Sequence, residues 1–170
     1  LNSKDTAKVK NYRLSMMDLN SHKISLLADT GSMKITEGDN VSINYSPMFT
    51  KDSKYLYFGA SERVLKEPKD TLLKSEKAKL DIWHHNDRVL QPQQLAELNR
   101  DLKKTDLYVY HMTDGKIVKL GNDTLSVRAQ KKQTGKYVLG SNKESYVRTY
   151  NWSMPWPKDY YLVSLETGNA

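Results

Sequence analysis

The sequence predicts an all-β fold, and three observations lead to that prediction. Short apolar and aromatic runs alternate with turn residues roughly every ten positions along the 170-residue chain. Two of these runs, 107–112 and 116–120, flank an Asp-Gly turn, which tolerates the positive φ that tight hairpins need. The aromatic residues are mostly tyrosine (Tyr 11, Trp 3, Phe 2), which suits a half-buried sheet surface better than a dry helical core.

The predicted strands follow one another along the chain and share two features. Each is a run rich in aliphatic, β-branched or aromatic residues, and each is bounded by residues that favour turns. An Asn-Ser-His turn joins the first two, and the turn 51–54 precedes the fourth. In chain order the predicted strands are 12–19, 23–27, 41–45, 55–60, 107–112, 116–120, 126–129, 136–140 and 159–165.

One region, 64–104, interrupts this rhythm and is predicted to be an exposed excursion from the sheet. Its first part, 64–79, is rich in lysine and only weakly periodic. Its last part, 92–103, has helical propensity, with Pro92 in the first turn, although a neighbouring sheet could override that preference. The leucines that would share one face of this helix are Leu95, Leu98 and Leu102.

Composition excludes several classes of function. The chain has no cysteine, so it holds no disulfide, thiol nucleophile or thiolate metal site. Mean hydropathy is -0.74, and no apolar run approaches the roughly 20 residues that span a membrane. The net charge of +7 comes from lysines spread over turns, so we expect no nucleic-acid partner. We expect no metal and no cofactor either, because adjacent strand residues such as His84 and His85 face opposite ways.

Hairpin patterns recur along the chain and refine the prediction. Segment 15–24 aligns with 107–117, and 161–169 begins a third copy; a second pattern links 50–61 with 133–141. Two interleaved hairpin types make a four-stranded unit, and β-propeller blades are repeats of such units. We therefore predict a partial β-propeller of two to three four-stranded antiparallel blades. The whole chain, 1–170, would be a fragment of one propeller domain, since the third copy is cut off. A β-sandwich with chance likeness among short strands is the alternative.

Three segments carry a resemblance to known proteins. Segment 46–58 looks like the blade motif of TolB-type propellers, in which Ser-Pro-Asp-Gly-Lys precedes a strand, although Met48 and Phe49 intervene here and Ser53 stands where the motif has glycine. Segments 79–94 and 146–168 resemble parts of the N-terminal propeller of bacterial prolyl oligopeptidase-family peptidases of the dipeptidyl and acylaminoacyl kind. The resemblance implies the non-catalytic part of a serine exopeptidase, which gates and selects peptide substrates for an α/β-hydrolase domain absent from this chain. It also implies a periplasmic or secreted parent.

The chain itself shows no catalytic residues. Peptidases of this family place their serine on a Gly-x-Ser-x-Gly elbow, and no such pentapeptide occurs here. The candidate substrate contacts are Arg148, Trp152 and Trp156, because rigid rings and a guanidinium on a loop can contact a peptide. The alternative is that both tryptophans fill the junction between blades.

The expected partners follow from the resemblance and from the strand pattern. They are the missing blades, the hydrolase domain, a peptide substrate and, through exposed sheet edges, other copies of the chain. Two other classes of protein remain open. One is a TolB-like propeller that mediates protein–protein interaction, and the other is a self-contained β-sandwich binding module.

Overall fold

A computed structural model describes residues 11–29, 35–36, 38–62 and 83–170. Within these ranges the chain is mostly β, as predicted, and every strand pairing is antiparallel. The first part of the predicted excursion, 64–82, lies outside the described residues. The elements are β1 (Arg13–Met17), β2 (Ile24–Asp29), β3 (Asp39–Val41), β4 (Met48–Phe49), β5 (Tyr55–Glu62), α1 (Gln91–Asp101), β6 (Asp106–His111), β7 (Ile117–Lys119), β8 (Leu125–Val127), β9 (Tyr137–Asn142), the 3-10 helix η1 (Glu144–Asn151) and β10 (Asp159–Ser164).

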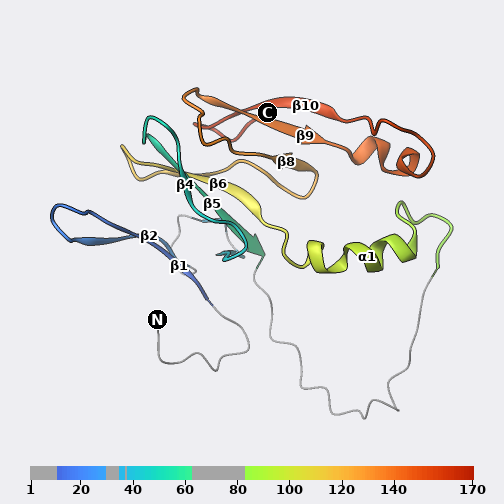
Figure 1. Cartoon of the computed structure of the whole chain (residues 1–170), viewed down its shortest axis with the longest axis horizontal. Helices are drawn as coiled ribbons and strands as arrows, with labels where there is room; N and C mark the ends of the chain where they lie inside the picture. The colour runs from blue at the N-terminus through green and yellow to red at the C-terminus, as the bar shows by residue number, and fades with distance from the viewer. Residues whose placement is uncertain (1–10, 30–34, 37, 63–82) are drawn as a thin grey trace, which may run out of the picture.

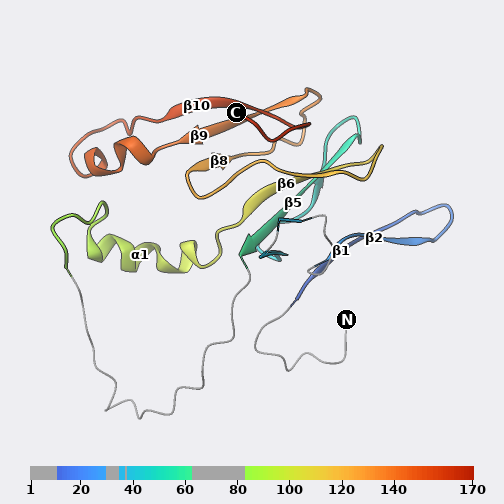
Figure 2. The same ribbon diagram turned by 180° about the vertical axis from the view of Figure 1, so that it is seen from behind.

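The strands form three sheets that lie one upon another. The hairpin β1–β2 is the first, the central sheet has the order β3-β5-β6-β7 with β4 also paired to β5, and the last has the order β10-β9-β8. The hairpin lies on one side of the central sheet and the last sheet on the other (Figure 1), and the view from behind gives the same order (Figure 2). Chain order and stacking order are therefore the same.

The central sheet is buried on both faces, because successive side chains of a strand point to opposite sides. Leu56, Phe58 and Tyr108 belong to a core shared with the β1–β2 hairpin. Tyr57 and Val109, both 0% exposed, belong to a second core shared with the last sheet. This placement explains why the strand 55–60 is apolar at every position instead of alternating.

One turn conformation occurs three times and gives the sequence repeat a physical basis. In each copy a backbone N–H at the end of one strand donates to the carbonyl five residues later. The fifth residue of each turn has positive φ: His22 at 55°, Gly115 at 69° and Gly168 at 76°. The three bonds run from Asp18 to Lys23 (3.0 Å), from His111 to Lys116 (2.8 Å) and from Ser164 to Asn169 (2.9 Å).

In the turn before β5, Ser53 adopts a backbone conformation that is typical of glycine. Ser53 has φ of 54°, in the left-handed region that glycine adopts at low cost. The Thr50 hydroxyl donates to Asp52 (2.7 Å) and accepts from the Tyr55 N–H (3.2 Å), which closes the turn. The Thr50 hydroxyl, followed by the N–H of Lys54, lowers the pKa of the Asp52 carboxyl.

Most predicted strand ends differ from the structure by one to two residues, and the predicted strand 41–45 differs most. The predicted strand 41–45 is wrong beyond Val41, because the Ser42 hydroxyl accepts from the Asn44 N–H (3.2 Å) and starts a turn. That turn brings Tyr45 against Gly59, a position where any side chain would collide with the Tyr45 Cβ. The helix predicted at 92–103 is confirmed and runs from 91 to 101 with proline in its first turn. The 3-10 helix η1 was not predicted.

Helix α1 lies away from the sheets and buries none of its residues. Its three leucines share one face as predicted, yet they are exposed: Leu95 59%, Leu98 49% and Leu102 73%. Neither helix among the described residues is long and apolar enough to span a membrane.

Candidate binding surface formed by two inter-strand insertions

Two connections at corresponding places in successive sheets carry the helices. The link from β5 to β6 contains α1, and the link from β9 to β10 contains η1. Because β5 and β9 run the same way in Figure 1, both links leave at the same end. Figure 1 shows α1 and the helix between β9 and β10 (η1) at the same end of the molecule, opposite the hairpin turns.

Direct contacts join the two insertions. Arg88, just before α1, forms an ion pair with Glu144 at the start of η1. Arg148 on η1 donates from Nη2 to the Asn86 carbonyl, 3.2 Å away. The predicted contact residue Arg148 therefore lies on this surface, where one of its guanidinium nitrogens already holds the neighbouring insertion in place.

The loop that precedes α1 forms a shallow pocket of about 280 Å³. The rings of His84 and His85 lie 4.6 Å apart, in a turn outside the sheets. The Asn86 N–H donates to His84 Nδ1 (3.2 Å), so this nitrogen is an acceptor and the proton of the neutral ring sits on Nε2. The pocket is lined by Trp83, His84, His85, Asp87, Leu90 and Gln91.

No metal centre forms at these histidines within the part of the chain that the structure describes. No group of three or more His, Cys, Asp or Glu side chains gathers there in a way that could hold an ion. A structural or catalytic zinc site needs three or four such ligands. The histidine pair is accordingly a polar and aromatic part of the pocket wall.

The two tryptophans predicted to contact substrate lie on the loop after η1, and neighbouring side chains hold only one of their rings in place. Trp156 stacks on Tyr150 with ring centroids 5.4 Å apart, and the Tyr150 hydroxyl donates to the Pro157 carbonyl (2.8 Å). Trp152 is 83% exposed and Trp156 53%, so the described residues enclose neither ring. One ring is thus held in a fixed orientation and the other projects from the surface.

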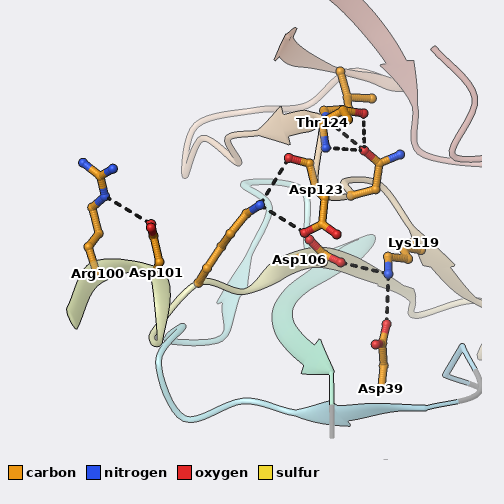
Figure 3. A network of polar contacts seen from close by, with 10 residues as sticks. Asp39, Arg100, Asp101, Asp106, Lys119, Asp123 and Thr124 are labelled. Carbon is orange, nitrogen blue, oxygen red and sulfur yellow. Dashed lines mark hydrogen bonds and ion pairs between the residues drawn. The ribbon is translucent and has the colours of Figure 1, made fainter. Parts of the chain in front are cut away.

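A partly buried charge cluster joins three strands of the central sheet at the same end as the insertions. Lys119 lies 3.0 Å from Asp39 and 2.8 Å from Asp106 (Figure 3). The Tyr108 hydroxyl also donates to Asp39. Lys104, next to α1, pairs with Asp123 at 3.1 Å. Sequence spacing gave no sign of the cluster, because its members come from three different strands.

The environment of the cluster shifts two pKa values. Burial, together with the hydrogen bond to Asp39, raises the pKa of Tyr108 to about 12. Burial acts to lower the pKa of Lys119, but its bonds to Asp106 and Asp39 outweigh that effect and raise it above its ordinary value. Lys119 therefore stays charged and Tyr108 stays neutral at physiological pH, which is the arrangement that the hydrogen bonds require.

The surface can bind and orient a ligand, but it contains no catalytic machinery among the described residues. Its groups are indole and imidazole rings, two arginines and a short helix, with no serine on a strained elbow beside an oxyanion-stabilising pair of N–H groups. A second pocket of about 360 Å³ lies at the opposite end. There His111 is 7% exposed and bonds through Nε2 to the Leu165 carbonyl (2.9 Å), a link between the central and last sheets.

Together, these features define a β protein of stacked antiparallel sheets. At one end, the connections that contain α1 and η1 form a surface that we call the insertion surface. Comparison of the chain with protein-family models, with curated proteins and with solved structures found no match.

Proposed function

We propose that the chain is the non-catalytic propeller portion of a serine exopeptidase and selects peptide substrates for a hydrolase domain. The main observation in favour of a propeller is the stacking of the three antiparallel sheets. Three sheets follow one another in chain order, and the turns that follow β1, β6 and β10, one in each sheet, share one conformation. Radial stacking of four-stranded antiparallel sheets is how propellers are built.

Strand counts in the three sheets support this proposal. The five-stranded central sheet contains a meander in which β4, β5, β6 and β7 are joined in order, as in one complete blade, and β3 pairs with the same edge of β5 as β4 does. The β1–β2 hairpin corresponds to β6–β7, the last two strands of a blade, and β8, β9 and β10 correspond to the first three. The first and last strands lie in different sheets on opposite sides of the central one, which favours a series of units over one closed sandwich.

The peptidase class rests on the resemblance of segments 79–94 and 146–168, while segment 46–58 resembles the blade motif of TolB-type propellers. One departure from the motif is compensated in the structure, because Ser53 keeps the positive φ of the glycine it replaces. The other two segments supply the insertion surface, which brings Trp83, Arg148 and Trp156 to one end of the stack. Rigid aromatic rings beside guanidinium groups suit contact with an extended peptide, since they bury apolar side chains and bond backbone carbonyls.

Substrate selectivity tests the proposal. In the product of the full reading frame that encodes this chain, Trp156→Ala should change the ratio of kcat/KM values between two peptides that differ in side-chain size. Arg148→Ala should act in the same direction. Lys131→Ala, in a turn at the opposite end of the stack, is the matched control and should leave the ratio unchanged. If Trp156→Ala and Arg148→Ala lower only the melting temperature and leave selectivity intact, the insertion surface does not select substrates.

A propeller that binds a protein partner, as in TolB-like proteins, is the second candidate. The observation that favours it is the exposure of Trp152 at 83% and Met154 at 80%, both on the loop after η1. Exposed apolar side chains on one loop are typical of protein–protein contacts. This candidate predicts a reading frame without a Gly-x-Ser-x-Gly elbow, whereas the peptidase requires one.

A further inference from the structure

The two outermost faces of the stack are apolar and exposed. On the last sheet, the face that points away from the centre presents Leu139 at 46%, Tyr160 at 66% and Leu162 at 68% exposure. On the β1–β2 hairpin, the outward residues Met17 and Ile24 are 49% and 69% exposed. Large exposed apolar patches are typical of surfaces that bind another protein, a membrane or a ligand.

The internal repeat shows what kind of surface the outer face of the last sheet is. Strand β9 corresponds to β5 and β10 to β6, because Tyr55 lies opposite His111 and Tyr137 opposite Ser164, with the shared turn following in both cases. The exposed trio Leu139, Tyr160 and Leu162 therefore occupies the positions of Tyr57, Leu107 and Val109 in the central sheet. Those three are 0%, 4% and 0% exposed, because the following sheet covers them.

The outer face of the β1–β2 hairpin also has an equivalent in the central sheet, on the side of the preceding sheet. Met17 lies opposite Ile24 just as Tyr110 lies opposite Ile117, and a lysine precedes each isoleucine. Tyr110 and Ile117 pack against the core that the central sheet shares with the preceding hairpin. The outer face of β1–β2 is thus equivalent to a face that receives a preceding sheet.

We infer that these two faces bind each other between copies of the chain, so that the last sheet of one copy packs on the β1–β2 hairpin of a second copy. The outer face of the last sheet is equivalent to a surface that a following sheet covers. The outer face of the hairpin is equivalent to a surface that a preceding sheet covers. A head-to-tail contact between copies would therefore repeat the sheet-on-sheet interface that occurs twice within the molecule. Such a contact is heterologous and leaves one free face at each end, which allows further copies to add. Each copy carries a net charge of +7, so added salt should strengthen the association.

Sedimentation velocity and light scattering on the purified 170-residue chain test this inference, independently of any peptidase activity. The wild type should form oligomers that grow with concentration. Leu162→Lys on β10 and Ile24→Lys on β2 should each yield the 19.6-kDa monomer. Both side chains are about two-thirds exposed in the isolated chain (68% and 69%), so far-UV circular dichroism should be unchanged. Leu98→Lys, at an exposed leucine of α1 outside both faces, is the control and should associate like the wild type.

A mixture of the two variants gives the decisive readout. Each variant keeps one intact face, and the two intact faces are the complementary pair, so an equimolar mixture should form a one-to-one heterodimer that does not grow further. A wild type that stays monomeric across the micromolar range would overturn the inference. So would association that survives both lysine substitutions, or a pattern in which only Leu162→Lys matters, since that pattern indicates a symmetric contact between two last sheets.

Discussion

Two buried tyrosines on neighbouring strands should respond in opposite ways to the loss of their hydroxyl groups. Tyr57 is 0% exposed, and no described residue bonds its hydroxyl. Tyr108 is 1% exposed, and its hydroxyl donates to Asp39. A buried polar group without a partner costs about 1–3 kcal/mol, whereas a hydrogen bond to a charged group contributes about 1.5–3 kcal/mol.

Tyr57→Phe should therefore stabilise the fold by about 1 kcal/mol, and Tyr108→Phe should destabilise it by about 2 kcal/mol. In a chain of this length, each kcal/mol corresponds to about 2–4 °C in melting temperature. Chemical denaturation with urea, followed by circular dichroism, measures both changes, and thermal melts provide a second readout. Equal destabilisation by Tyr57→Phe and Tyr108→Phe would contradict this prediction, because the Tyr57 hydroxyl would then have a stabilising partner.

Three further predictions concern packing, turns and pH. Leu165→Ala, at a side chain with 0% exposure between the central and last sheets, should cost about 2–5 kcal/mol in urea denaturation, and a cost below about 1 kcal/mol would contradict the shared core. Gly115→Ala should cost about 1 kcal/mol because φ there is 69°, whereas Gly135→Ala, with open space at its Cβ position, should be neutral or slightly stabilising; equal effects on the melting temperature would argue against the turn conformation. Burial raises the pKa values of Tyr57 and Tyr108 to about 12. Unfolded tyrosines lose their protons near pH ~10, so the native state binds more protons above that pH and stability should fall as pH rises. Urea titrations at a series of alkaline pH values test this, and a stability that stays constant through that range would contradict the burial of both hydroxyls.

The strands could be predicted from sequence because their signals are local. Apolar runs bounded by turn residues gave β1, β2, β5 and β6 within a few residues, and the Asp-Gly turn placed the hairpin at Gly115 correctly. Proline in the first turn and leucines on one face identified α1. In each case the information lies within one segment of the chain and needs no tertiary contact.

Features that depend on tertiary contacts could not be predicted in this way. The end of β3 is set by Ser42 and by the packing of Tyr45 on Gly59, a residue from another strand. The cluster around Lys119 joins β3, β6 and β7, and no spacing in the sequence brings these strands together. On the candidate surface, Arg148, Trp152 and Trp156 remain predicted substrate contacts, and no sequence pattern indicated the bonds between η1 and the loop before α1. Those bonds are made across 62 residues in the case of Arg148 and Asn86.

Hydrolysis of a peptide nitroanilide tests the central claim most directly. We predict no turnover by the 170-residue chain alone. The full reading-frame product should cleave the peptide with a serine on a downstream Gly-x-Ser-x-Gly elbow, and replacing that serine with alanine should abolish the activity. A reading frame without an elbow would contradict the proposal, as would turnover by the chain alone that is lost when one of its own residues is replaced.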